Sequence, residues 1–202
     1  MISEPTALVF GSLKKKVMKY PITVYGDPVL RKRAENISKD TEGLAEIIDN
    51  MWETMYYADG VGLAAPQAGM SIRMFVIDAS SGADDEPELK DFKKVFINPE
   101  VIELSGEKWA FNEGCLSLPE IREDVLRPDE VRIKYFDENF VEHDEVFKGY
   151  AGRIIQHEYD HLEGKLFTDY LSPLRKRLLK SKLNDIARGK VQPHYKIKPP
   201  VK

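Results

Sequence analysis

Cysteine and long apolar runs are scarce in this chain of 202 residues. The single cysteine, Cys115, excludes an internal disulfide. It is typical either of a protein from a reducing compartment, hence an expected cytoplasmic location, or of a thiol kept for chemistry. No apolar run approaches the ~20 residues that a membrane helix needs, so no membrane partner is expected. The first residues carry an acid, Glu4, and only a short apolar patch, which argues against a secretory signal.

The division of the chain follows from its patterning. A second methionine, Met18, stands immediately before the first segment that is patterned like a folded chain, so we expect residues 1–17 to be a dispensable, disordered leader. Residues 18–171 are expected to form one domain, which suits their length. Residues 172–190 are expected to form a basic helix, and residues 191–202, with three prolines, an extended tail.

Charge is distributed unevenly between the body and the C-terminal end. The segment Leu171–Lys202 holds ten Lys and Arg residues against one acid, whereas the rest of the chain holds 20 against 33. One interpretation is that these bases bind an anionic partner. The other is that they only keep an amphipathic helix soluble while its apolar stripe packs on the body, through Leu174, Leu178 and Leu183.

Three helices are predicted from the spacing of apolar residues and from their end signals. The first covers residues 39–58, with Asp40 or Thr41 as its N-cap. The second covers Gly149–Leu162 and the third runs from Ser172 to Gly189, with proline in its first turn.

Short strands are predicted between the first and second helices, separated by turn residues and by a polar, acidic surface loop at Ser80–Asp91. Helices and strands do not alternate as βαβ units, so the predicted fold class is α+β. The predicted strands are Ile72–Asp78, Val95–Asn98, Val101–Leu104, Lys108–Asn112, Val131–Phe136 and Val141–Phe147.

The strongest signal for chemistry is the run His157-Glu158-Tyr159-Asp160-His161 in the second predicted helix. Positions i and i+4 lie one above the other on a helix, so both imidazoles point to one place and can bind a divalent metal. Glu158 follows the first histidine, where it can meet a water at the metal without being a ligand. The alternative is a solvated helix face with ordinary charges, but this helix also has an apolar side.

Two histidines leave such a site incomplete, because catalytic zinc sites typically use three protein ligands. The peptidase pattern that continues to a third histidine is excluded, because that position holds Phe167. The pattern that uses a downstream glutamate is excluded, because the last glutamate, Glu163, is only two residues past His161. Of the remaining donors, His194 lies in the expected tail and Asp169 has no matching motif.

Cys115 is the better candidate for the third ligand. A thiolate is a good ligand for zinc or ferrous iron. A lone cysteine is more often a small buried hydrophobe, but Glu113 and Gly114 before it are unusual in a core strand. A nucleophilic Cys/His pair is the other alternative, although it would leave the i, i+4 histidine geometry without a use.

Three separated motifs occur together in the order known from one family. GVGLAAPQ at 60–67, EGCLS at 113–117 and QHEYDH at 156–161 resemble the three motifs of the peptide deformylases, over a region from about Tyr25 to Leu171. The resemblance implies an α+β fold in which small antiparallel sheets surround the helix that carries HExxH. It further implies that residues 18–171 form a catalytic domain that removes the N-formyl group from N-formylmethionyl nascent peptides and releases formate.

The resemblance also implies roles for individual residues. It implies three metal ligands, Cys115, His157 and His161, with Fe²⁺ as the native metal and Zn²⁺, Ni²⁺ or Co²⁺ as substitutes. Glu158 would accept the proton of the attacking water and deliver it to the leaving amine. The side-chain amide of Gln67 and the backbone N–H of Leu116 would donate to the oxyanion.

The substrate peptide is expected to bind as an extended strand with its backbone near Gly62 and Gly114. Val61 and helix residues 155–157 are expected to help line an apolar pocket for the methionine side chain. Arg122 is placed to reach carbonyl groups further along the substrate, although a surface salt bridge would account for it equally well.

The basic C-terminal helix gains a specific interpretation from the resemblance, since some family members dock on the ribosome through a C-terminal helix. The expected contacts are to phosphates of ribosomal RNA, and no DNA partner is expected. The bases concerned are Arg175, Lys176, Arg177, Lys180, Lys182 and Arg188.

Three rival functions remain at this point. An HExxH endopeptidase is disfavoured by the missing third histidine or downstream glutamate. A domain with a structural metal is disfavoured because such sites are closed by four ligands and only three have plausible motifs here. An RNA-binding module is disfavoured because most of the chain is acidic.

Overall fold

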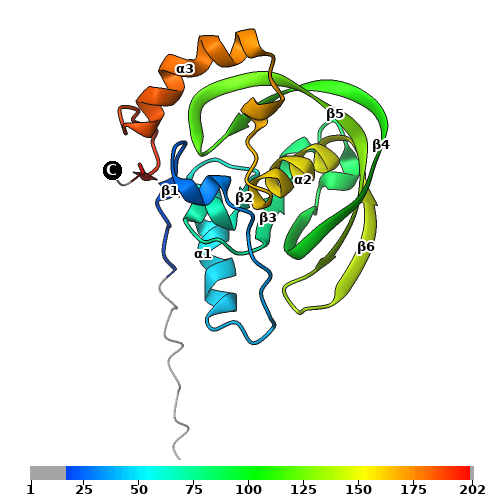
Figure 1. Cartoon of the computed structure of the whole chain (residues 1–202). Helices are drawn as coiled ribbons and strands as arrows, with labels where there is room; N and C mark the ends of the chain where they lie inside the picture. Colours follow the sequence, from blue (N-terminus) through cyan, green and yellow to red (C-terminus); the bar gives the residue numbers. More distant parts are fainter. Residues whose placement is uncertain (1–16, 201–202) are drawn as a thin grey trace, which may run out of the picture.

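The computed structural model describes residues 17–200, so the expected leader at 1–17 lies outside the described residues except for Val17. A helix, α2 (Gly149–Leu162), lies at the centre, and a strongly curved antiparallel sheet wraps around it (Figure 1). The helices α1 (Leu44–Tyr57) and α3 (Pro173–Ala187) lie outside this arrangement. The predicted α+β class is confirmed. Within residues 17–200, no helix has both the length and the apolar character to cross a membrane.

The main sheet has five strands in sequential, antiparallel order. Its two long central strands pair from Ile97 opposite Phe136 to Cys115 opposite Leu118 and form a hairpin that curves past α2 (Figure 1). The five strands are β2 (Gly62–Ala64), β3 (Met74–Asp78), β4 (Lys93–Cys115), β5 (Leu118–Phe136) and β6 (Glu142–Phe147).

The long strands differ from the short ones that the sequence predicts. The three predicted strands between residues 95 and 112 are parts of the 23-residue β4, and the first half of the 19-residue β5 was not predicted. In β4, no residue from 100 to 112 is buried, so the alternation of buried and exposed side chains is lost there. In the first half of β5 burial does alternate, but charged residues, Glu123 and Arg127, occupy buried positions, so the apolar pattern is missing from the sequence. Register shifts interrupt the pairing at several points, including one between Ser105 and Lys108.

The helix α1 begins later than predicted. Its N-cap is Gly43, which has a φ of 70° and no capping side chain, so the prediction of Asp40 or Thr41 as the cap was wrong. Thr41 instead accepts a backbone hydrogen bond from the N–H of Leu44 at 3.3 Å in the preceding turn. The inner face of α1 is apolar as predicted and packs against β2 and β3 through Leu44, Ile48, Met51 and Met55.

The central helix α2 has the predicted bounds and is buried at every residue from Ala151 to Glu158. A Cβ atom at Gly152 would lie 3.0 Å from the carbonyl oxygens of Asp129 and Phe147, so glycine lets the helix approach the sheet backbone closely. This tight packing fixes the direction in which the histidines of α2 project.

The helix α3 begins as predicted at Ser172, whose hydroxyl accepts a hydrogen bond from the backbone N–H of Arg175 at 3.3 Å. Leu174 and Leu178 are 66% and 61% exposed, so the prediction that they pack on the body was wrong. The buried face of the helix consists of Leu179, Leu183 and Ile186.

The C-terminal tail packs on the body over its described residues, 191–200. Its strand β7 (Ile197–Lys198) pairs in parallel with β1 (Ile22–Thr23) near the start of the described chain (Figure 1). The side chain of Tyr195 joins the core formed by α1, β2 and β3 and is only 9% exposed. Short 3-10 turns complete the fold: η1 (Pro28–Arg31), η2 (Ala65–Ala68), η3 (Ser80–Gly82), η4 (Pro87–Leu89) and η5 (Phe167–Tyr170).

Candidate active site

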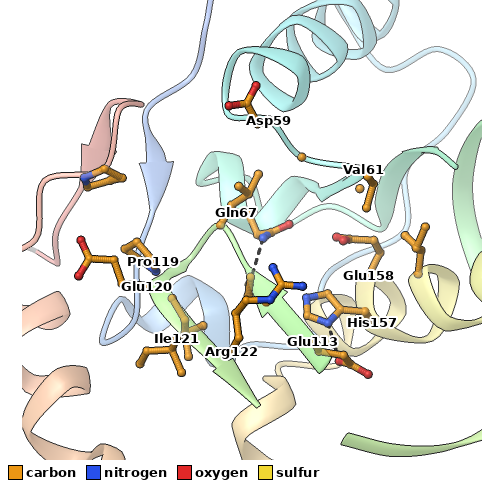
Figure 2. Close-up of a pocket in the computed structure, with 18 of the residues that line it drawn as sticks. Asp59, Val61, Gln67, Glu113, Pro119, Glu120, Ile121, Arg122, His157 and Glu158 are labelled. Atoms are coloured by element: carbon orange, nitrogen blue, oxygen red, sulfur yellow. Dashed lines mark hydrogen bonds and ion pairs between the residues drawn. The ribbon is translucent and has the colours of Figure 1, made fainter. Parts of the chain in front are cut away.

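A cavity of about 520 Å³ lies between β2, the tip of the β4–β5 hairpin and α2 (Figure 2). Ten residues are predicted to be metal ligands, catalytic groups or individual substrate contacts, and nine of them line this cavity. The tenth, His161, lies one turn beyond His157 on α2. The three motifs, far apart in the sequence, therefore meet at one place.

The three predicted metal ligands are brought together here. Sγ of Cys115 lies 3.3 Å from Nε2 of His161, and one donor atom from each of Cys115, His157 and His161 lies within 4.8 Å of the others. Burial lowers the pKa of His161 well below its usual range, which favours the neutral ring that binds metals. One sulfur and two imidazole nitrogens at this separation fit a divalent transition metal.

The ring of His157 is oriented by Glu113. The carboxylate of Glu113 accepts a hydrogen bond from Nδ1 of His157 at 2.9 Å, which leaves Nε2 to face the cavity (Figure 2). Burial opposes ionisation of Glu113, but hydrogen bonds from His157 and Arg127 outweigh it and lower its pKa to about 2. The carboxylate is therefore ionised at neutral pH and supports the basicity of the ring.

Further buried charged residues next to α2 form a hydrogen-bond network with Glu113. Arg127 donates to Glu113 at 2.7 Å and to Asp160 at 2.6 Å, and Arg153 donates to Glu113 at 3.1 Å. The hydroxyl of Tyr170 donates to the second oxygen of Asp160 at 2.8 Å. Sequence reasoning missed this network because its members share no spacing. The one usable signal was an acid two positions before the candidate ligand Cys115.

Glu158 faces the cavity from α2, next to the first histidine (Figure 2). It is 4% exposed, and its Oε2 atom has no hydrogen-bond partner among the described residues. Burial raises the pKa of Glu158 to about 7. A buried carboxyl group with a free oxygen and a near-neutral pKa is suited to transferring protons.

Gln67 lies opposite Glu158 on η2 and is 1% exposed, so its amide is buried in the site and is not a surface group. Its Oε1 accepts a hydrogen bond from the backbone N–H of Ala64 at 2.7 Å, so the NH₂ group points into the site, 3.5 Å from Sγ of Cys115 (Figure 2). Leu116 also lines the cavity, directly after Cys115.

The residues predicted to bind substrate lie along the cavity walls. Val61 and Gly62 form one wall, and Gly114 and Arg122 belong to the hairpin opposite. Arg122 donates to the side chain and the carbonyl of Asn112 at 3.1 and 2.9 Å. These two hydrogen bonds hold its side chain in place without the surface salt bridge that was the alternative explanation for this residue.

One detail of the predicted apolar pocket was wrong. Ile155 is fully buried in the core behind α2, and it is Ile154 that lines the cavity. The two isoleucines are neighbours on the helix and face different directions. The apolar pattern alone does not show which of them faces the cavity.

Comparisons with known proteins agree with this geometry. A sequence profile of the polypeptide deformylase family matches residues 19–177. The peptide deformylase of Christiangramia forsetii is 57% identical over 190 residues, which cover 91% of this chain and 97% of the relative. That of Flavobacterium johnsoniae is 53% identical, with coverage of 90% and 96%. The crystal structure of a peptide deformylase from Legionella pneumophila is 37% identical, has a TM-score of 0.75 and covers 85% of this chain and 97% of its own. The chain therefore belongs to the polypeptide deformylase family, whose members are metal-dependent enzymes that remove N-formyl groups from nascent peptides.

Proposed function

We propose that this chain deformylates the N-terminal formyl-methionine of newly made polypeptides and that the catalytic residues are those gathered in the cavity. The observation that supports this most is the meeting of three metal donors with Glu158 and Gln67 at one point. A substrate emerging from the ribosome implies a cytoplasmic location.

The proposed metal ligands are Cys115, His157 and His161, with Fe²⁺ as the native ion and Zn²⁺, Ni²⁺ or Co²⁺ as substitutes. The thiolate supports this choice, since it suits iron and zinc better than it suits magnesium or calcium. A bound ion of this kind acts as a Lewis acid and makes hydroxide available near neutral pH.

Glu158 is the proposed proton carrier of the reaction. Its free Oε2 accepts the proton of the water that attacks the formyl carbon. The same carboxyl group then gives this proton to the leaving amine, which departs only when protonated. Burial raises the pKa of this carboxyl group above its ordinary value, which favours uptake of the proton.

Gln67 and Leu116 are the proposed donors to the oxyanion of the tetrahedral intermediate. The amide of Gln67 is held in place beforehand by its bond to Ala64, so it needs no reorganisation during the reaction. Loss of one such donor typically costs about 3–4 kcal/mol in the transition state.

The substrate is proposed to lie between the two walls of the cavity as an added strand, with its backbone near Gly62 and Gly114. Val61 and Ile154 line the cavity next to the metal donors and supply apolar surface for the methionine side chain. Arg122, fixed by Asn112, stands where it meets carbonyl groups further along the chain.

The direct test is formate release from formyl-Met-Ala-Ser by anaerobically prepared protein, with metal analysis of the same sample. We expect formate in amounts that follow the metal content. An unformylated peptide of the same sequence serves as the control. Cleavage of that peptide without formate release would identify an endopeptidase instead.

We expect Gly62 to be essential because there is no room for a side chain between it and the carboxyl group of Glu158. A Cβ atom at position 62 would lie 2.5 Å from Oε1 and 2.9 Å from Cγ of Glu158, so Gly62→Ala forces the carboxyl group out of place. We expect kcat to fall by about a hundredfold, as for a misplacement of about 1 Å, with normal metal content.

A second substitution, Glu158→Asp, tests this explanation because its side chain is shorter. Combined with Gly62→Ala, its effect on kcat should be smaller than the sum of the two separate effects, because the clash is relieved. A wild-type kcat in Gly62→Ala, or strict additivity in the double variant, would contradict the explanation.

We further propose that residues 18–171 carry out the reaction and that α3 docks the enzyme on ribosomal RNA. Arg175 and Lys176 bind Glu123 and the carbonyl of Asp169 in the body, so the proposed phosphate contacts are those of the exposed Arg177, Lys180, Lys182 and Arg188. The exposed Leu174 and Leu178 on the same helix support an outward-facing contact.

Ribosome binding by α3 should depend steeply on salt. Co-sedimentation of the protein with ribosomes should weaken between about 50 and about 200 mM salt as counterions compete for the phosphates. Replacing Arg177, Lys180 and Lys182 by glutamine should weaken binding further, whereas Lys39→Gln and Lys90→Gln, outside α3, should not. Binding that is independent of salt would argue against the proposal.

A further inference from the structure

The C-terminal tail forms part of the active-site cavity, although α3 separates it in the sequence from every predicted site residue. Residues Pro193, His194 and Tyr195 line the cavity together with Gln67 and Cys115. The tail is held there by its strand β7, where the carbonyl of Lys196 accepts a hydrogen bond from the N–H of Ile22 at 2.8 Å. The tail is thus fixed in position beside the reacting groups.

Tyr195 reaches from this tail to the main chain of Leu116. Its hydroxyl donates to the carbonyl oxygen of Leu116 at 2.9 Å, and its ring is packed in the core. Burial raises the pKa of Tyr195, so the phenol remains protonated and keeps its donor role. The ring has little freedom to move, and its hydrogen bond is therefore well placed to restrain its acceptor.

Leu116 needs such a restraint because it lies outside the regular sheet. Leu116 and Ser117 form the turn between β4 and β5, and the last ladder pair is Cys115 with Leu118. The carbonyl of Ser117 accepts from the N–H of Tyr25 at 2.9 Å, and that of Leu116 accepts from Tyr195. These two bonds hold the turn from outside the hairpin.

The neighbouring wall of the cavity touches both the tail and this turn. Nε2 of His194 lies 3.3 Å from Oδ2 of Asp59, which leads into the glycine-rich segment. A Cβ atom at Gly60 would lie 2.9 Å from Cδ1 of Leu116, so the two walls are already in contact. The turn at Leu116 is therefore packed against the neighbouring wall of the cavity.

We propose that Tyr195 is a positioning residue for deformylation: its hydroxyl holds the Leu116 main chain so that the N–H of Leu116 faces the oxyanion. This inference rests on the proposed function, in which that N–H is an oxyanion donor. Tyr195 touches neither substrate nor metal in this role. Its effect belongs to the transition state and should appear in kcat rather than in KM.

The test is Tyr195→Phe, which removes only the hydroxyl and keeps the packed ring. We expect kcat for formyl-Met-Ala-Ser to fall about tenfold, less than the hundred- to thousandfold loss for a missing oxyanion donor. KM, metal content and thermal stability should stay close to wild type. Hydrogen–deuterium exchange in residues 113–118 should become faster, because the turn has lost one restraint.

Lys196→Ala is the matched control, since its side chain is exposed in the same tail and the paired backbone is unchanged. This variant should match wild type in both kcat and exchange. An unchanged kcat in Tyr195→Phe, unchanged exchange in 113–118, or a loss of activity that only follows a loss of metal would each overturn the proposal. Absence of formate release by the wild-type protein would instead overturn the proposed function.

Discussion

Replacing Glu158 by glutamine should nearly abolish formate release while the metal stays bound. Glutamine has the same shape, so it fits beside Gly62, but its amide accepts no proton from water and delivers none to the leaving amine. General acid–base groups contribute about 10²- to 10⁴-fold to a rate, and we expect a loss of kcat in this range. The measurement is kcat on formyl-Met-Ala-Ser together with metal content per chain.

Stability provides a second readout for the same variant. In metal-free protein, burial raises the pKa of Glu158 from its ordinary 4.5 to about 7, so folding favours the neutral carboxyl group. The contribution of Glu158 to the free energy of unfolding therefore decreases as the pH rises from 4.5 through 7, and Glu158→Gln should lack this contribution. The measurement is the free energy of unfolding of both metal-free proteins by denaturant, at pH 4.5 and at pH 7.

Glu107→Gln is a suitable control, since Glu107 is exposed on β4 and does not line the cavity. It should leave both kcat and the pH dependence of stability unchanged. A Glu158→Gln variant that turns over substrate at the wild-type rate would remove Glu158 from the mechanism, whatever its stability.

The features that sequence reasoning predicted well are those with a local pattern. The i, i+4 histidines and the apolar face of α2 lie within four turns of one helix, so spacing alone placed His157 and His161 together. The Ser172-Pro173 start of α3 is likewise a local capping signal. The predicted strand Lys108–Asn112 ends shortly before Cys115, and β4 ends at Cys115 itself.

The features that it missed depend on contacts between distant segments. Glu113, Arg127 and Asp160 become a network only when the β4–β5 hairpin curves around α2, and buried charges have no periodic signature. Tyr195 was missed for a related reason: its tail is basic and contains prolines, and this composition is typical of an exposed segment. Its docking depends on strand pairing with Ile22, more than 170 positions away in the sequence.

Removing the thiol should remove the metal. In Cys115→Ala only two imidazoles remain at the site, and we expect protein purified without chelator to contain little or no bound metal and to release no formate. The loss should also appear in unfolding, since an ion present at about a hundred times its dissociation constant stabilises a fold by about 2.7 kcal/mol. A chelator should therefore lower the melting temperature of the wild type and leave that of Cys115→Ala unchanged.

The same variant separates a ligand from a nucleophile, the alternative that the sequence left open for Cys115. A nucleophilic cysteine would also be essential for turnover, but its removal would leave the metal content and the chelator response intact. Ser117→Ala, two residues along the same turn, keeps all three donors and should retain the metal. Cys115→Ser should behave like Cys115→Ala, because a serine hydroxyl stays protonated where a thiol ionises and binds iron or zinc poorly. Normal metal content in either Cys115 variant would exclude the thiol as a ligand. Cys115 would then be interpreted as the nucleophile of a Cys/His pair.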